Sequence, residues 1–141
     1  MVKLVDMGGG DFVSHTVTEV HDNNQIIAAG CAIKTGAATS ARELDFVILD
    51  SVGRVVDAAS TSFTIPNSEI FAAIKKNSTF GSTSLIVENN PIICIFLRTS
   101  LSLPILKDFK VTFGIEGKTQ GDIFTSSFMI ISEINDELNF G

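Results

Sequence analysis

Apolar and polar residues alternate along most of the 141-residue chain, and turn-forming residues interrupt the pattern about every ten residues. Side chains of a β-strand point alternately to its two faces, so this pattern predicts strands with one buried face. The segments that follow it most clearly are 12–20, 26–34, 44–49, 54–59, 109–115 and 123–134. Between 44–49 and 54–59, Asp50-Ser51-Val52-Gly53 predicts a tight hairpin turn.

The segment 85–97 breaks the alternation. Its second half, 92–97, is six consecutive apolar residues, and its first half, 85–87, is also apolar. Between them, Glu88-Asn89-Asn90-Pro91 is strong turn chemistry. A strand that is apolar on both faces is either buried on both sides or covered on its outer face by a partner. We therefore expect a β-hairpin at the centre of a sheet.

One segment, 66–77, has the spacing of a short helix. Asn67 or Ser68 can cap its start, and Lys75-Lys76 suits its end. The apolar residues at helical spacing are Ile70, Ala73 and Ile74. This pattern predicts a helix of two to three turns that closes one end of a sandwich.

About eight strands and one short helix predict an all-β fold, a single β-sandwich of the jelly-roll type. An immunoglobulin-like sandwich is the alternative, although its usual Cys–Trp–Cys core cannot form without Trp. We expect three parts: a flexible N-terminal arm at 1–11 that contains three consecutive glycines, the sandwich at 12–134, and an acidic tail at 135–141.

Charge and hydropathy narrow the function classes. The net charge of −6 disfavours binding to nucleic acid, which depends on clustered Lys and Arg. No apolar run approaches the roughly 20 residues of a membrane helix, so we expect no membrane partner. Yet the chain is 45% hydrophobic and only 18% charged, with a mean hydropathy of +0.35. A subunit interface is the natural place for this apolar excess.

The two cysteines, Cys31 and Cys94, lie in apolar segments and are expected to be buried free thiols, unless their strands are neighbours and they pair. The first residues do not have the length of a secretory signal. We therefore expect synthesis in the cytoplasm and a final location in an assembled particle.

A possible metal site at His15, Glu19 and His21 fails on distance. On a strand these residues share a face, but six residues separate the two histidines by roughly 20 Å. One ion with ligands at about 2.1 Å cannot contact both. We expect a solvated strand face here, and no metal or other cofactor.

Two further sequence patterns bear on catalysis. Gly114-Ile115-Glu116-Gly117-Lys118-Thr119 resembles a phosphate loop, but Thr112 stands where the motif needs Gly, so we expect a hairpin turn. No Gly-x-Ser-x-Gly elbow is present for a serine nucleophile. The sequence therefore predicts a protein that is not an enzyme.

The apolar excess, the Gly-rich arm and the tail favour assembly. The contacts that we expect to mediate it are Met7, Phe12, Leu138 and Phe140. In size and composition the chain resembles small β-sandwich virion proteins, such as capsid decoration or tail proteins. That resemblance implies a homo-oligomer, with a trimer expected, bound to a larger protein lattice.

The alternative is a binding module for carbohydrate or for another small ligand. Acidic residues around the predicted hairpin, Asp45, Asp50 and Asp57, could hold Ca²⁺ through oxygen ligands. The chain has eleven Phe but no Tyr or Trp, which counts against a sugar platform.

Overall fold

The computed structural model describes residues 2–18, 24–75, 84–86, 92–97 and 106–133, and these form ten strands and no helix. The strands are β1 (Val2–Asp6), β2 (Val13–Thr16), β3 (Asn24–Lys34), β4 (Arg42–Leu49), β5 (Val55–Phe63), β6 (Glu69–Lys75), β7 (Ser84–Ile86), β8 (Ile92–Leu97), β9 (Lys110–Glu116) and β10 (Ile123–Glu133).

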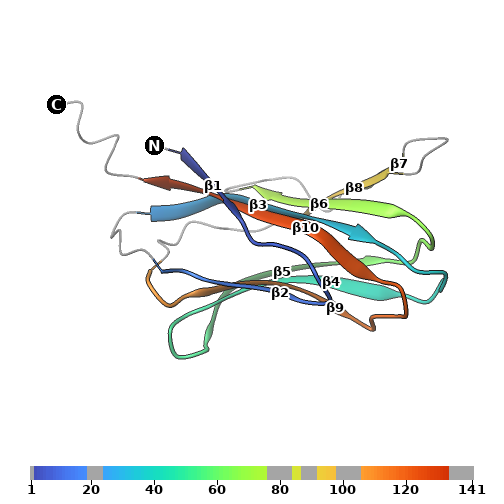
Figure 1. Ribbon diagram of the computed structural model, residues 1–141, viewed down its shortest axis with the longest axis horizontal. Helices are drawn as coiled ribbons and strands as arrows, with labels where there is room; N and C mark the ends of the chain where they lie inside the picture. The colour runs from blue at the N-terminus through green and yellow to red at the C-terminus, as the bar shows by residue number, and fades with distance from the viewer. Residues whose placement is uncertain (1, 19–23, 76–83, 87–91, 98–105, 134–141) are drawn as a thin grey trace.

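The strands form two sheets that pack face to face as a β-sandwich (Figure 1). The six-stranded sheet has the order β1-β10-β3-β6-β8-β7, and the four-stranded sheet has the order β2-β9-β4-β5. All neighbours are antiparallel except β6 and β8, which are parallel. The predicted β-sandwich is therefore confirmed.

The strand order also bears on the type of sandwich. With β7 and β8 set aside, β1-β10-β3-β6 faces β2-β9-β4-β5, and the chain crosses between the sheets at every step except from β4 to β5. This succession is compatible with an eight-stranded jelly roll that has an inserted hairpin, and the jelly-roll type remains a prediction. In the immunoglobulin-like alternative the first two strands share a sheet, whereas β1 and β2 lie in different sheets.

The predicted helix at 66–77 is wrong, because this segment contains β6. Ile70 and Ala72 are buried while Phe71 between them is exposed, which is the alternation of a strand. In so short an apolar run the two periods overlap, and the pairing with β3 on one side and β8 on the other decides between them. Instead of capping a helix, Ser68 donates its backbone N–H to Thr35 Oγ1 at 2.9 Å.

The predicted hairpin at 85–97 forms, since β7 pairs with β8 in antiparallel orientation. Its position was predicted wrongly: β7 is the edge strand of the six-stranded sheet, and the central strands are β3 and β6. The turn predicted at 88–91 lies outside the described residues.

The N-terminal segment 1–11 is not a free arm. Residues 2–6 form β1, which pairs with β10 along its whole length. The backbone then runs to the other sheet, held by a hydrogen bond from Gly10 N to Phe124 O at 2.8 Å. The tail at 135–141 lies outside the described residues.

The motif at 114–119 does form a turn, with Gly117 at a φ of 71°. It is not a hairpin turn, however. It joins β9 of the four-stranded sheet to β10 of the six-stranded sheet, so it crosses the sandwich (Figure 1). The turn at 50–53 is the predicted hairpin turn, and Asp50 Oδ1 accepts hydrogen bonds from the backbone N–H groups of Val52 and Arg54.

The core lies between the sheets and is largely aliphatic and aromatic. Phe46, Phe113 and Phe124 form a tilted stack through it, with ring centroids 5.0 Å and 6.3 Å apart. Each of these rings comes from a different strand, so the stack joins β4, β9 and β10 and fixes the two sheets against each other.

Candidate functional site

The part of the six-stranded sheet formed by β1, β3, β6 and β10 has an apolar outer face, although this face points away from the core. On β10, the inward residues Met129 and Ile131 are buried in the core, while Phe128 and Ile130 between them point outward and are half-buried. β3 and β6 likewise carry apolar residues on both their inward and their outward faces. The residues of this apolar outer face are Leu4, Ala28, Gly30, Ala32, Phe71, Ala73, Phe128 and Ile130.

The register places these residues side by side across four strands. Ile130 lies opposite Leu4 on one side and Ala28 on the other. Gly30 lies between Phe128 and Ala73, and Ala32 lies opposite Phe71. Leu4 is 66% exposed and Phe71 is 42% exposed, so two large apolar side chains stand open to solvent on this face.

Gly30 has a specific packing role in the apolar outer face. A Cβ atom at this position would lie 2.6 Å from Cε1 and Cζ of Phe128 and 3.0 Å from the carbonyl oxygen of Ala72. The Phe128 ring therefore lies directly on the Gly30 backbone. Only glycine leaves this space, so the Phe128 ring covers the centre of the face, and Leu4 and Phe71 stand exposed on either side of it.

Charged residues lie at the margin of this face. Asp6, on β1, lies opposite Phe128 of β10. At the other end of the face, Lys34 lies opposite Glu69. Asp6, Lys34 and Glu69 are all exposed. The margin thus carries both signs of charge around an apolar centre, which is the usual anatomy of a protein interface.

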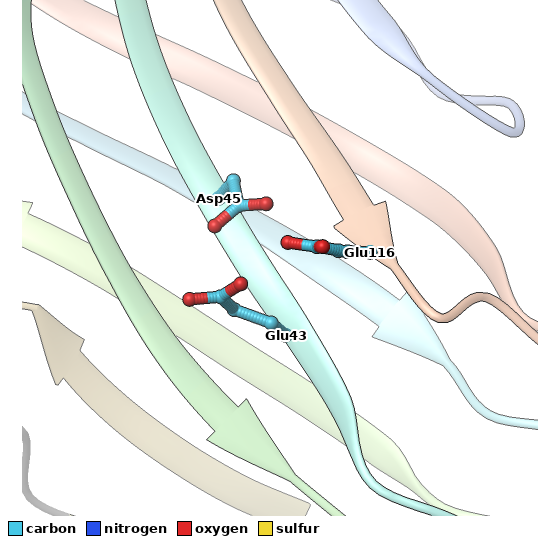
Figure 2. Close-up of side chains that lie close together, drawn as sticks. All are labelled: Glu43, Asp45 and Glu116. Carbon is cyan, nitrogen blue, oxygen red and sulfur yellow. The ribbon is translucent and has the colours of Figure 1, made fainter.

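The outer face of the four-stranded sheet is different, because three carboxyl groups gather on it (Figure 2). Glu43 and Asp45 are two residues apart on β4 and so point to the same side. Glu116, at the end of β9, is directly opposite Glu43 in the register. One oxygen from each of the three carboxyl groups lies within 4.8 Å of the others.

The pKa values of two members of this carboxylate trio, Asp45 and Glu116, are raised. A hydrogen bond shared with Glu43, together with the negative charges of Glu43 and Asp45, raises the pKa of Glu116. Partial burial raises the pKa of Asp45, and the charge of Glu43 adds to the effect. Like charges this close favour protonation or a bound cation. Oxygen ligands of this kind suit Ca²⁺ or Mg²⁺.

Beside the trio, an open hollow of about 360 Å³ lies over β4 and β9. Asp45 and Glu116 line it together with Phe12 and Thr112. Phe12 is 59% exposed, and its ring lies over Gly114, where a Cβ atom would come within 3.2 Å of it. The hollow thus combines an exposed aromatic ring with two carboxyl groups.

The structure places the three acidic residues that the sequence suggested for Ca²⁺ in different surroundings. Asp45 joins Glu43 and Glu116. Asp50 serves the hairpin turn and forms an ion pair with Arg54 at 3.1 Å; Asp57 lies on β5, where its Oδ1 accepts the N–H of Ala58. Alternation along 42–49 indicates that Glu43 and Asp45 share a face, but the contribution of Glu116 depends on the β4–β9 register, which the sequence does not display.

The other singled-out residues lie apart from these surfaces or outside the described chain. His15 is half-buried on β2. Among the described residues it belongs to no group of three His, Cys, Asp or Glu side chains that could hold a metal ion. Glu19 and His21 lie outside the described residues. Cys31 is a buried free thiol, as expected, and burial raises its pKa to about 12.

The predicted assembly contacts are placed as follows. Met7 is partly buried and packs against the core of its own chain. Phe12 is exposed on the four-stranded sheet, and Leu138 and Phe140 lie outside the described residues. The apolar outer face was not among the predicted contacts, although the unbroken apolar run Phe128–Ile131 is the sequence signal that marks it.

Comparison with known proteins gives little guidance. No protein-family model matches the chain, and no curated protein matches its sequence. Among solved structures, the chain is similar to part of an agarase, AgWH50C, with a TM-score of 0.41 and 11% identity over 86% of this chain and 18% of the agarase. It is also similar to a chain of infectious bursal disease virus, Gx strain, with a TM-score of 0.26 and 12% identity over 99% of this chain and 42% of the viral chain.

These scores are too low to support an argument about function. This chain also spans far less than two thirds of either structure. Within the described residues there is no helix that could cross a membrane.

Proposed function

We propose that this protein is a non-enzymatic structural protein that assembles with further copies of itself through the apolar outer face of its six-stranded sheet. The observation that carries the proposal is the apolar character of both faces of β3, β6 and β10. A sheet whose outer face meets water alternates apolar and polar residues, whereas a sheet covered on both sides does not. Something apolar therefore covers this face in the working protein.

A second copy fits this face because large and small residues alternate on it. Leu4 and Phe71 are large and exposed, whereas β3 and β6 contribute small alanines to the same face. In a twofold pair, the large side chains of one copy can meet the small residues of the other. The mixed margin of Asp6, Lys34 and Glu69 permits opposite charges to meet in the same arrangement.

The finer part of the proposal is that the assembled protein is a virion component, a capsid decoration or tail protein bound to a larger lattice. The low charge content, the absence of an enzyme motif and the jelly-roll interpretation of the strand order support it. A face that packs on its own copy favours a twofold pair. The trimer expected from the sequence remains a prediction about the symmetry of the assembly.

The experiment is an absolute mass measurement by light scattering with refractive-index detection over a range of concentrations. A chain without Trp or Tyr absorbs too weakly at 280 nm for ultraviolet detection. We expect a discrete multiple of 15.1 kDa that the substitution Phe71→Ser shifts toward the monomer. Val52→Ser is the matched control, because Val52 is 70% exposed at the β4–β5 turn, away from the face. A monomer at every concentration would contradict self-assembly.

A second candidate function is the binding of a carbohydrate or another small ligand at the hollow beside Phe12. The observation in its favour is an exposed aromatic ring next to the carboxyl groups of Asp45 and Glu116, which can accept hydrogen bonds from hydroxyl groups. Ca²⁺-dependent retention on a glycan array that Phe12→Ser abolishes would support it. Unchanged retention in that variant would contradict it.

A further inference from the structure

The strand β5 differs from the other edge strands of the sandwich. Within the described residues the edge strands are β1 and β7 of the six-stranded sheet and β2 and β5 of the four-stranded sheet. β7 has three residues, β2 has four, and β1 has five that include Lys3 and Asp6. β5 has nine, Val55–Phe63, and Asp57 is the one charged residue among them. Short or charged edges resist pairing with another chain, whereas a long and nearly uncharged edge invites it.

The hydrogen-bond pattern of the four-stranded sheet determines which backbone groups of β5 point to its outer edge. Val47 of β4 lies opposite Ala58, and its carbonyl oxygen accepts a hydrogen bond from a threonine of β9, on the side away from β5. The Ala58 N–H donates to the carboxylate of its own neighbour, Asp57. Because the direction of these groups alternates along an antiparallel ladder, Ala58, Ser60 and Ser62 direct their backbone N–H and C=O groups away from β4.

The outer edge of β5 is open at Ser60 and Ser62. Both residues are exposed, and no described residue forms a backbone hydrogen bond with them on that side. β8 of the other sheet comes near β5, but its pairings are with β6 and β7. The irregularity in the β4–β5 pairing lies at the other end of β5, where the register shifts between Ile48 and Leu49. A bulge blunts an edge, and the segment 59–63 has no such protection.

We propose that a second copy of the chain pairs with this edge, β5 against β5 in antiparallel orientation about a twofold axis at Thr61. In that register Ser60 lies opposite Ser62 of the other copy, and each such pair exchanges two backbone hydrogen bonds. Thr61 meets its own counterpart, and Ser and Thr are favourable cross-strand neighbours. The two Asp57 residues are eight positions apart along the pair, roughly 26 Å, so like charges do not meet.

This contact is separate from the apolar outer face, which belongs to the other sheet. It joins the four-stranded sheets of two copies edge to edge. A chain that carries two different twofold contacts links its pairs into a larger assembly. The inference does not rest on assembly through the apolar outer face, and each contact can fail alone.

The test is the mass of the Phe71→Ser chain by light scattering over a range of concentrations, because this substitution disables the outer face. We expect a dimer of two 15.1 kDa chains. Adding Ser62→Pro removes an N–H from the edge and should raise the dissociation constant about tenfold or more. Ser14→Pro is the matched control on the short edge strand β2. Since Val17 N bonds to Phe109 O on the β9 side, Ser14 directs its N–H to the outer edge of β2.

Circular dichroism should show that each proline variant is folded, and Ser14→Pro should leave the dimer intact. A Phe71→Ser chain that is monomeric at every concentration would overturn the pairing and leave the edge to a strand of another protein. A dimer that Ser62→Pro leaves intact, or that Ser14→Pro weakens equally, would also overturn it. Failure of the outer-face proposal gives a different result, in which Phe71→Ser does not change the mass and Ser62→Pro alone produces the monomer.

Cross-linking tests the register of the pair. In a Cys94→Ser background, Thr61→Cys should form a disulfide-linked dimer under mild oxidation, because the two copies of residue 61 meet at the axis. Val52→Cys, exposed at the β4–β5 turn, is the control and should cross-link far more slowly. Equal rates in the two variants, or no cross-link in a folded Thr61→Cys chain, would overturn the twofold axis at Thr61.

Discussion

Arg42 and Asp122, eighty residues apart in the chain, form a two-pronged ion pair in which both side chains are fully buried. Arg42 Nε donates to Asp122 Oδ2 at 2.9 Å, and its Nη2 donates to Oδ1 at 3.0 Å. The same carboxylate accepts the backbone N–H groups of Gly36 and Thr119. Asp122 thus ties the start of β4 to the loop after β3 and to the turn that crosses between the sheets.

The Arg42–Asp122 pair contributes to a lowered pKa of Asp122. Burial opposes the ionisation of Asp122, but the Arg42 guanidinium and the N–H groups of Gly36 and Thr119 outweigh it and hold the pKa of the carboxyl well below its usual range. A carboxyl group with a lowered pKa stabilises the folded state at pH values above its ordinary pKa. This stabilisation is lost as the pH falls toward the lowered pKa. The pair therefore stabilises the fold at neutral pH.

Removing the charge of Asp122 should be costly. Asp122→Asn leaves the Arg42 guanidinium buried without its counter-ion, which typically destabilises a protein by about 3–5 kcal/mol. Urea unfolding followed by circular dichroism measures the change. Arg54→Gln, which breaks the ion pair with Asp50 at the exposed hairpin turn, is the control and should cost a small fraction of that amount. Equal losses in the two variants would contradict the role given to Asp122.

The packing of Phe128 on Gly30 gives a second prediction. Gly30→Ala places a methyl group within 2.6 Å of the Phe128 ring, so the ring must move and the variant should lose about 1–3 kcal/mol of stability. Phe128→Leu in the same chain removes the ring carbons that clash and should recover part of the loss. A double-mutant cycle from urea unfolding measures the coupling. Additive effects of the two substitutions would show that the contact does not constrain Gly30.

The carboxylate trio predicts a pH dependence opposite to that of Asp122. Because the pKa values of Asp45 and Glu116 are raised, their contribution to stability is present below the ordinary carboxyl range and is lost as the pH rises through the raised values. Glu43→Gln removes one charge from the trio and should raise the melting temperature slightly at about pH 7 and less at about pH 4.

Melting curves by circular dichroism at the two pH values test this expectation. Glu69→Gln, an exposed carboxyl on the other sheet, is the control and should show no such gain at neutral pH. A loss of stability in Glu43→Gln at about pH 7 would indicate that the three charges do not repel one another in the folded protein.

The Cys31 thiol should be inert in the folded protein. It is buried, and burial raises its pKa to about 12, so almost none of the reactive thiolate exists at neutral pH. In a Cys94→Ser background, a disulfide reagent such as dithionitrobenzoate should react with Cys31 only after unfolding in guanidinium. Reaction in native buffer at the rate of the unfolded chain would contradict this placement.

The fold class was predictable because alternation identifies strands wherever one face is buried and the other is wet. Alternation failed as a signal at β6, where Phe71 points outward between the inward residues Ile70 and Ala72, so no polar residue marks the period. It also failed at β1, since three glycines after Met7 suggested a free arm while the edge of β10 was available to pair with it. Both errors arise where the outer face is apolar.

The surfaces were less predictable than the strands. An apolar run such as 128–131 is typical of a strand covered on both sides, but which residues join it from β1, β3 and β6 depends on register. The Arg42–Asp122 pair and the position of Glu116 beside Glu43 depend on register in the same way. Sequence patterns identify the face of one strand, whereas a site needs neighbours from several strands.

The central claim, that a second copy covers the apolar outer face, is tested most directly by carbene footprinting with mass spectrometry over a series of protein concentrations. In the isolated chain Leu4, Phe71 and Val52 are all exposed, so all three should label in dilute solution. As the measured mass rises with concentration, labelling of Leu4 and Phe71 should fall while Val52 stays fully labelled. Labelling of Leu4 and Phe71 that does not change as the mass rises would contradict the claim.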